Sequence, residues 1–209
     1  MKNRLLYSRF YLSGCMDRVA DGGTIWRKEL TPWLNSRGIV VLNPCEKPCS
    51  VGKETTESRK LRYETKLEGN YELLLQDREV RSVDLRMVDI CDAMIVNLDM
   101  TQMPCGTWEE LFWANREKKP IIVRIEQGRN HVPDWLSWTI GMSTIFSTWD
   151  EVKAYIDHIA FAPDDQIDRL KRWIFFDFDK VTTPALNGWD VFKNGAAFDS
   201  IRRKQIAQR

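Results

Sequence analysis

Two adjacent glutamates follow a glycine between two apolar runs of the chain. The glutamates, Glu109 and Glu110, lie in residues 105–110, with one apolar run at 93–99 and the other at 120–125. This order predicts a strand, a glycine turn, a helix whose first turn holds both glutamates, and a second strand. The helix dipole favours an ionised carboxylate at that end. Such a carboxylate can act as a nucleophile, although acidic residues also favour the first turn of a helix for structural reasons alone.

A further carboxylate interrupts an apolar helical stripe upstream. Residues 77–91 carry apolar side chains at helical spacing, and Asp84 lies among them. A carboxylate on a buried stripe is costly unless it has a partner or a chemical role. The helix should run antiparallel to the strand at 93–99, so Asp84 is expected near the sheet edge that holds the glutamates. Alternatively, Asp84 has only a structural role and either lies at the border of the apolar stripe or pairs with Arg81 or Arg86.

Strands and helices alternate along most of the chain. Strands are expected at 9–14, 39–44, 93–99, 121–125 and 143–147, and helices at 25–36, 54–67, 77–91, 106–117 and 149–159. This alternation predicts an α/β fold: a flavodoxin-like, doubly wound, five-stranded parallel sheet with helices on both faces. Pro32 predicts a kink or a break in the first helix, because proline removes an interior hydrogen bond.

One α/β domain is expected over residues 1–160, with a C-terminal extension over 161–209 that packs on the core or at a subunit interface. Residues 46–76 are polar and charged and are expected to form an insertion or lid. In the extension, Asp177 and Asp179 resemble the Asp-x-Asp strand end of haloacid-dehalogenase phosphatases. Only thirty residues follow them, too few for the α/β domain that such a site requires, so no phosphatase site is expected.

Composition argues against several classes of partner. The 209 residues carry a formal net charge of +1, so no global field favours nucleic acid or a membrane. The first residues lack a long apolar segment, no run is long enough to span a bilayer, and no signal peptide is expected. Five cysteines at irregular spacing, with no histidine near Cys45 and Cys49, predict reduced thiols in a cytoplasmic protein without a metal site.

Polar clusters follow the predicted strands at their carboxyl ends, where open α/β sheets bind ligands. The candidate ligand-binding residues are Tyr11, Ser13, Gly14, Asp17 and Arg18 after the first strand, Asn43 after the second, Asp99 after the third, and Gly106 and Thr107 before the glutamates. Asp92 instead precedes a strand. It is therefore expected at the opposite edge of the sheet, with a structural role.

These residues resemble the nucleoside 2-deoxyribosyltransferase family. The Tyr-Leu-Ser-Gly run at 11–14 is similar to the opening of family members. An Asp-x-x-x-Val-x-x-x-Asp pattern at 84–92, a strand, and Gly-x-x-x-Glu-Leu-x-x-Ala at 106–114 are similar to their core. The resemblance covers about residues 9–159. Two departures concern base recognition and pocket size: Pro104 stands where many members have an aspartate, and Phe112 where they tend to have glycine.

The resemblance assigns roles to three side chains. Glu110, rather than Glu109, takes the place of the nucleophile, Asp84 that of the residue that contacts the nucleobase, and Tyr11 that of the residue that steers the nucleophile. The implied reaction transfers a 2-deoxyribosyl group between nucleobases through a covalent glycosyl-enzyme, as in a retaining glycosidase. Asp84 or Asp99 would exchange a proton with the departing base. The implied partners are a small-molecule deoxynucleoside or deoxynucleotide and a free nucleobase, with no cofactor, in a homo-oligomer.

Two alternatives stay open. The protein could be an N-glycosidase that hydrolyses 2-deoxynucleoside 5′-monophosphates, because Arg18 and the glycine-rich helix start at 22–24 could bind a phosphate. The structural interpretation of that segment is a turn in which Thr24 caps the helix. The protein could also be a non-catalytic nucleotide-binding module or a scaffold with a degenerate site.

Overall fold

The computed structural model describes residues 3–17, 19–47, 55–163, 166 and 172–173. Arg18, the two aspartates at Asp177 and Asp179, and most of the expected C-terminal extension lie outside the described residues. Among the described helices, none combines the length and apolarity that crossing a bilayer requires.

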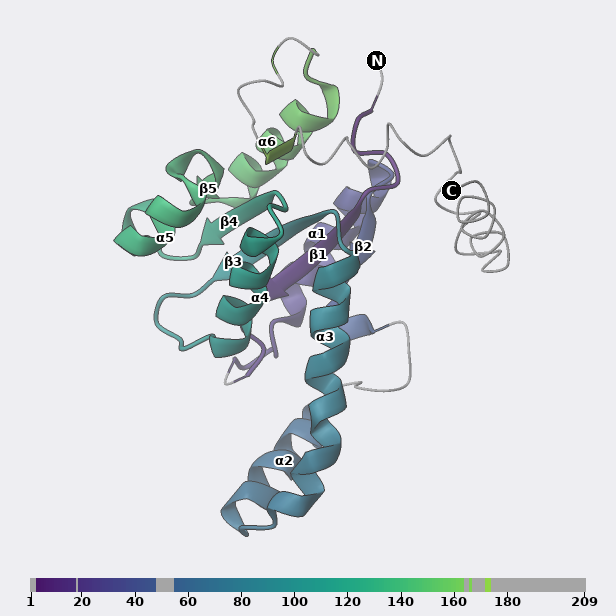
Figure 1. The fold of residues 1–209 in the computed structure, drawn as a ribbon, viewed down its shortest axis with the longest axis vertical. Helices are drawn as coiled ribbons and strands as arrows, with labels where there is room; N and C mark the ends of the chain where they lie inside the picture. The colour runs from purple at the N-terminus through teal and green to yellow at the C-terminus, as the bar shows by residue number, and fades with distance from the viewer. Residues whose placement is uncertain (1–2, 18, 48–54, 164–165, 167–171, 174–209) are drawn as a thin grey trace, which may run out of the picture.

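A five-stranded parallel sheet forms the centre of the molecule (Figure 1). The strands are β1 (Arg9–Gly14), β2 (Val40–Leu42), β3 (Ala93–Leu98), β4 (Ile121–Ile125) and β5 (Ile145–Phe146), in the order β2-β1-β3-β4-β5. This order is that of a flavodoxin-like, doubly wound sheet, and its switch point lies between β1 and β3. The predicted fold class is therefore confirmed.

Helices cover both faces of the sheet. The covering helices are α1 (Thr24–Ser36), α3 (Arg78–Ile90), α4 (Cys105–Arg116), α5 (Asp134–Ile140) and α6 (Trp149–Phe161), and a further helix is α2 (Thr56–Leu67). Short 3₁₀ helices span Pro44–Glu46, Tyr71–Asp77, Arg129–His131 and Met142–Thr144.

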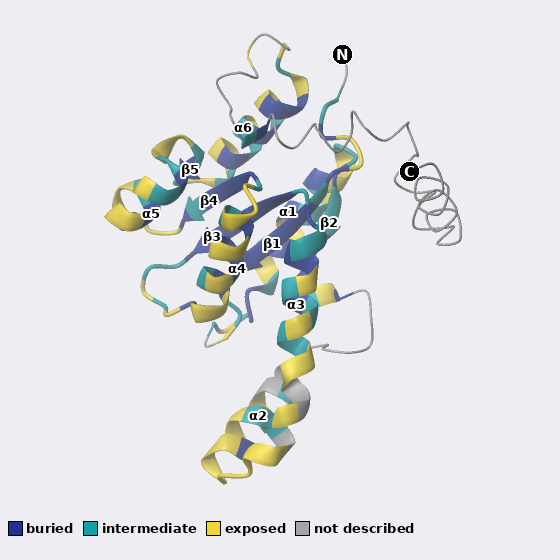
Figure 2. Cartoon of the chain, viewed as in Figure 1, coloured by how far each residue is buried: buried dark blue, intermediate teal, exposed yellow. Residues whose placement is uncertain are grey.

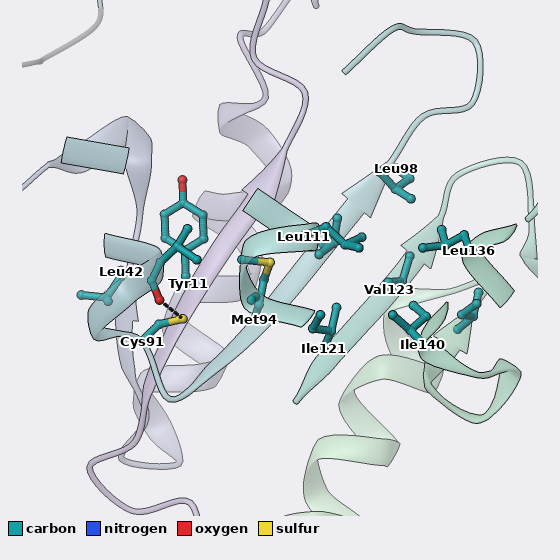
Figure 3. Packing of buried hydrophobic residues seen from close by; sticks show 14 of the residues in the cluster. Tyr11, Leu42, Cys91, Met94, Leu98, Leu111, Ile121, Val123, Leu136 and Ile140 are labelled. Atoms are coloured by element: carbon teal, nitrogen blue, oxygen red, sulfur yellow. Dashed lines mark hydrogen bonds between the residues drawn. The ribbon is translucent and has the colours of Figure 1, made fainter. Parts of the chain in front are cut away.

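The core divides into one layer on each face of the sheet because successive strand side chains point to opposite faces. In β3, Met94 and Val96 pack with residues of α3, α4 and α5, whereas Ala93 and Ile95 pack with residues of α1 and α6. Figure 3 shows the first layer around Met94 and Leu111, and Figure 2 shows that buried residues follow the strands. Burial on both faces explains why the strands read as nearly continuous apolar runs.

The helix α2 and the 3₁₀ helix Tyr71–Asp77 lie beyond the start of α3, away from the sheet (Figure 1). Thr55 caps α2 by accepting a hydrogen bond from the backbone N–H of Ser58, whose hydroxyl accepts one from the backbone N–H of Thr55 in return. Much of this segment is exposed, including the apolar side chains of Leu61 and Leu67. It corresponds to most of the expected insertion at 46–76.

Two helices begin or continue differently from the sequence prediction. The expected break at Pro32 does not occur, and α1 is one helix from Thr24 to Ser36. The N-cap residue of α1 is Gly23 rather than Thr24, and the carboxylate of Asp21 accepts the N–H groups of Gly23 and Ile25. The helix α4 begins at Cys105, directly after Pro104, so Glu109 and Glu110 lie in its second turn rather than its first.

Shorter elements also differ. The strands β2 and β5 are shorter than predicted because 3₁₀ turns occupy Pro44–Glu46 and Met142–Thr144. The helix α5 was not predicted. It has only seven residues, too few for a clear apolar period.

Asp92 lies at the edge of the sheet opposite the glutamates. Its carboxylate accepts the backbone N–H of Arg9 at 2.7 Å and two guanidinium N–H groups of the same residue at 3.1 and 2.9 Å. These contacts tie the start of β1 to the loop before β3. Asp92 therefore has a structural role, at the edge of the sheet opposite the carboxyl ends of the strands.

We expect Asp92→Asn to lower the free energy of unfolding by about 1.5–3 kcal/mol, because charge-assisted hydrogen bonds to Arg9 are lost. Chemical denaturation measures this change. Asp150→Asn is the matched control, since Asp150 is almost fully exposed and lies 3.9 Å from Lys153. Equal stability of the two variants would contradict the structural role of Asp92.

Candidate active site

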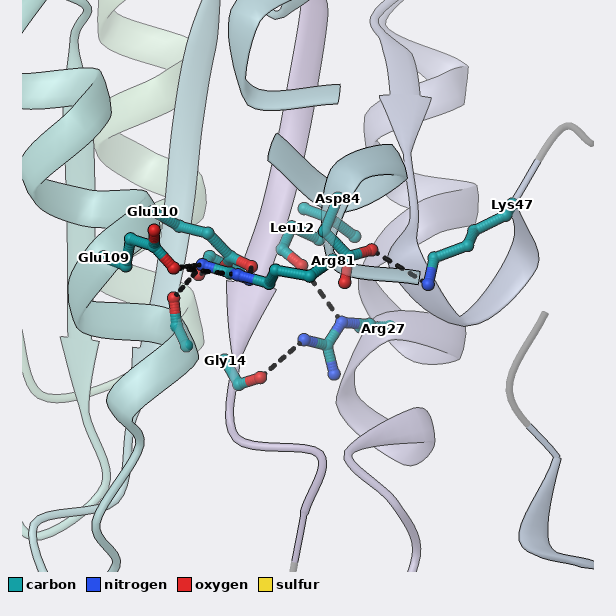
Figure 4. Close-up of polar contacts among 10 residues, drawn as sticks. Leu12, Gly14, Arg27, Lys47, Arg81, Asp84, Glu109 and Glu110 are labelled. Atoms are coloured by element: carbon teal, nitrogen blue, oxygen red, sulfur yellow. Dashed lines mark hydrogen bonds and ion pairs between the residues drawn. The ribbon is translucent and has the colours of Figure 1, made fainter. Parts of the chain in front are cut away.

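The Glu110 carboxylate is buried where the end of β1 meets α4. Its Oε2 accepts the hydroxyl hydrogen of Ser13 at 2.5 Å, and its Oε1 pairs with Nη1 of Arg81 at 2.5 Å (Figure 4). Glu109 is the next residue in α4 but its side chain is half exposed. The two hydrogen bonds fix the plane of the Glu110 carboxylate and stabilise its charge, while a lone pair remains on each oxygen.

Arg81 joins α3 to the start of α4. Its Nε and Nη2 donate to Oε2 of Glu109 at 2.9 and 2.7 Å, and Nη2 also donates to the carbonyl of Gly106 at 2.8 Å. Burial lowers the pKa of Arg81, but the charges and hydrogen bonds of Glu110 and Glu109 outweigh it, so this pKa is raised. Arg81 therefore stays charged and holds both glutamates.

Tyr11 lies beneath Glu110 and is fully buried. Its hydroxyl makes no hydrogen bond of good geometry to the described residues. Burial, the negative charges of Glu110 and Asp84, and a contact of the hydroxyl with Glu110 raise the pKa of Tyr11 well above its usual range. The phenol thus keeps its proton and can donate it toward the Glu110 carboxylate.

Asp84 forms a buried ion pair with Lys47, whose Nζ lies 3.0 Å from Oδ1 of Asp84 (Figure 4). The side chain of Lys47 is 0% exposed and that of Asp84 10%. The expected structural partners are engaged elsewhere, because Arg81 binds the glutamates and Arg86 lies 3.7 Å from Asp89. Removing either partner of a buried ion pair leaves the other charge without that partner, so each of the two side chains holds the other in place.

A cavity of about 470 Å³ opens over these side chains. It is lined by Gly14, Cys15, Met16 and Asp17 after β1, Val80, Arg81 and Asp84 of α3, residues 102–107 and Glu110 around the start of α4, and Arg62 of α2. Its volume falls in the range of small-molecule sites. Carboxylates and guanidinium groups share the wall, so the cavity suits a polar ligand of modest size.

Most of the predicted ligand-binding residues meet at this cavity. Gly14, Asp17, Gly106 and Thr107 line it, and Ser13 binds Glu110 beside it. Position 14 has no room for a side chain larger than that of glycine. A Cβ atom there would lie 3.0 Å from the carbonyl oxygen of Asn97 and 3.1 Å from the ring of Trp26.

Two predicted residues lie outside this cavity. Asn43 is buried, and its side chain accepts the N–H of Cys45 at the start of a 3₁₀ turn. Asp99 lines a separate cavity of about 300 Å³ beside Trp26, and its Oδ1 accepts hydrogen bonds from Thr101 and Gln127. Neither residue lines the cavity over Glu110. Arg18 lies outside the described residues.

Two cations of the site were not predicted as site residues. Arg81 precedes Asp84 by three positions, so both lie on one helix face, and this spacing was a usable signal. Lys47 follows a 3₁₀ turn and gives no periodic signal. In the part of the chain that the structure describes, no group of three or more His, Cys, Asp or Glu side chains could hold a metal ion.

Three solved structures are similar to the chain at low sequence identity. A 2-deoxyribosyltransferase from Leishmania mexicana shares 16% identity, with 72% of this chain and 98% of that chain covered and a TM-score of 0.47. A 2-deoxyribosyltransferase from Bacillus psychrosaccharolyticus shares 16% identity, covering 71% and 96%, with a TM-score of 0.44. A CMP N-glycosidase from Clostridium botulinum shares 15% identity, covering 73% and 98%, with a TM-score of 0.40.

No protein-family model matches the chain, and no curated protein matches it. The assignment of a function therefore rests on the residues of the site.

We expect Lys47→Met to lower the free energy of unfolding by about 3–5 kcal/mol, because it leaves the Asp84 carboxylate buried without this cation. Urea denaturation measures the loss, and Lys28→Met on the exposed surface of α1 is the control. The double variant Lys47→Met with Asp84→Leu should recover part of the loss. Equal stability of Lys47→Met and Lys28→Met would show that the ion pair contributes nothing.

Proposed function

We propose that the protein transfers a 2-deoxyribosyl group between nucleobases, with Glu110 as the nucleophile. The observation that supports this most is the carboxylate of Glu110, buried beside a cavity and hydrogen-bonded through both oxygens to Ser13 and Arg81. It lies at the carboxyl edge of the sheet beside the switch point between β1 and β3, where such folds bind ligands. An oriented, ionised carboxylate in such a place can attack an anomeric carbon.

The reaction proceeds in two balanced steps. An oxygen of Glu110 forms a bond to the anomeric carbon as the bond from that carbon to the base nitrogen breaks. The base leaves with the electron pair of the broken bond and takes up a proton from solvent water. A second base then attacks the same carbon, gives its proton back to solvent water and releases the carboxylate. Both steps pass through an oxocarbenium-like transition state, which forms more easily on a sugar without an electron-withdrawing 2-hydroxyl group.

The surrounding side chains serve this cycle. Tyr11 keeps its proton beside Glu110 and steers the carboxylate. Asp84 lines the cavity and contacts the nucleobase, and its pairing with Lys47 keeps its carboxylate able to accept a hydrogen bond from a ring or amino N–H. Glu109 is not among the residues that line the cavity, and it holds Arg81.

The start of α1 supports a nucleoside substrate over a 5′-monophosphate. The carboxylate of Asp21 accepts the N–H groups of Gly23 and Ile25 at 3.0 and 2.8 Å, so these donors are already occupied by an anion. Burial raises the pKa of Asp21, but these backbone hydrogen bonds outweigh it and lower this pKa. A phosphate would have to displace a stable carboxylate. Hydrolysis of the monophosphate is therefore the second candidate, supported by the guanidinium groups of Arg62 and Arg81 in the cavity wall.

The direct test is to incubate the protein with each 2-deoxynucleoside or its 5′-monophosphate, with and without a second free base, and to separate the products by chromatography. A new nucleoside that forms only with the second base supports transfer. Release of free base and sugar phosphate from the monophosphate alone would favour hydrolysis, and no turnover with any substrate would favour a binding module.

Glu110→Ala should lower kcat at least roughly a thousandfold, because the nucleophile is removed. Glu109→Ala is the matched control on the next residue of the same helix and should keep kcat within about tenfold, because Arg81 retains its contact with Glu110. Thermal unfolding checks that both variants fold. Similar losses in both, or full activity of Glu110→Ala, would refute the assignment of the nucleophile.

Substrate selectivity gives a separate prediction. We expect 2-deoxynucleosides to react at least as fast as their 5′-monophosphates and faster than ribonucleosides, because α1 offers no free anion site and a 2-hydroxyl group destabilises the transition state. Values of kcat/KM for the three substrate classes with one base measure this. A clear preference for the monophosphate would reverse the choice between transferase and hydrolase.

A further inference from the structure

Arg27 is an arginine of α1 with no exposed surface. Its Nε donates to the carbonyl of Leu12 at 3.1 Å and its Nη2 to that of Gly14 at 3.0 Å (Figure 4). Its Nη1 donates to the carbonyl of Gly23 at 2.5 Å. Two of these carbonyls flank Ser13, the residue that binds Glu110. Burying a guanidinium is costly, so its place here requires an explanation.

The length of β2 explains the contacts with β1. The last pair between the two strands joins Tyr11 to Leu42, whereas β1 pairs with β3 as far as Gly14. The last three residues of β1 therefore have a strand partner on one side only. The carbonyls of Leu12 and Gly14 are two residues apart and point to the same edge of β1. Arg27 supplies donors to both.

We infer that Arg27 is a positioning residue for the reaction proposed above: it holds the end of β1 so that the Ser13 hydroxyl meets Glu110, and it places a fixed positive charge under the site. This inference rests on the proposed function. Arg27 is not among the residues that line the cavity, so a substrate bound there would not touch it. It acts through Ser13 and through the electrostatic field at Glu110.

The charge of Arg27 has no ion pair with a carboxylate of the described residues. Burial lowers the pKa of Arg27, while Cys45, Tyr11 and Glu110 act in the opposite direction. A guanidinium stays protonated even so, because its ordinary pKa is very high. This positive charge interacts with the carboxylate of Glu110, the group that the proposed reaction uses as an anion.

Arginine is required because the three acceptors come from two segments of the backbone. A guanidinium presents its donors in a rigid planar fork, whereas a lysine ammonium is a single point on a flexible stem. The ring of Trp26 also lies 4.4 Å from the guanidinium carbon and covers one of its faces. A lysine at position 27 would keep the positive charge but would lack the planar set of donors that a guanidinium has.

The test compares Arg27→Met and Arg27→Lys with the wild-type protein in deoxyribosyl transfer. Arg27→Met should lower kcat on the order of a hundredfold with little change in KM, as expected for a misplaced catalytic group. The acid limb of its pH profile should move to higher pH, because a positive charge that interacts with the Glu110 carboxylate is removed. Arg27→Lys should restore the acid limb but not the full kcat.

Two further variants separate positioning from a general loss of structure. Arg4→Met is the matched control, since Arg4 also donates to backbone carbonyls, those of Ile159 and Ala162, far from the site. It should lower the melting temperature and leave the pH profile unchanged. In a Ser13→Ala background, Arg27→Met should lower kcat by much less than in the wild type, because both changes remove the same contact.

The outcomes are distinct. If the wild-type protein is active and Arg27→Met changes neither kcat nor the pH profile, this inference alone is overturned. It is also overturned if the effects of Ser13→Ala and Arg27→Met on kcat are additive and the acid limb of the pH profile is unchanged. If Arg27→Met does not fold, Arg27→Lys supplies the test, and its full activity would show that the fork is not needed. A wild-type protein without turnover of any 2-deoxynucleoside overturns the proposed function and this inference with it.

Discussion

The hydrogen bond from Ser13 to Glu110 joins two segments that are 97 residues apart in the sequence. It forms because β1 and β3 pair in parallel, with Ser13 opposite Val96 and Gly14 opposite Asn97, so that β1 ends where α4 begins. A shift of one residue in β1 would turn Ser13 to the other face of the sheet. The register of one strand pair thus decides whether the carboxylate has an oriented partner.

Charges around this contact follow one rule, which is that each buried carboxylate has a cation from another element. Arg81 of α3 binds Glu109 and Glu110 of α4, and Lys47 binds Asp84. Breaking such a pair leaves an uncompensated charge, so these cations fix the relative places of the elements as well as the state of the carboxylates. The guanidinium of Arg27 differs, since backbone carbonyls are its partners.

Periodicity and strand ends predicted the fold class and the segments that form the cavity. The five strands, their parallel order and the inward place of Asp84 follow from apolar runs and helical spacing, which depend on neighbouring residues. The polar contacts were harder to predict. Lys47 reaches Asp84 from a loop, and the carboxylate of Asp21, rather than the hydroxyl of Thr24, accepts N–H groups at the start of α1. Both contacts depend on three-dimensional positions that spacing does not encode. Because α4 begins at Cys105, the two glutamates lie in its second turn and not in its first turn as predicted. Hydrogen bonds therefore orient Glu110 more than the helix dipole does.

The most direct measurement is the mass of the protein when turnover of a 2-deoxynucleoside is quenched with acid in the absence of a second base. We predict that a fraction of the protein is heavier by one deoxyribosyl group, with the added mass on the peptide that contains Glu110. Glu110→Ala should show no added mass. Product formation without an adduct on Glu110, or an adduct on another side chain, would contradict the claim that Glu110 carries the sugar.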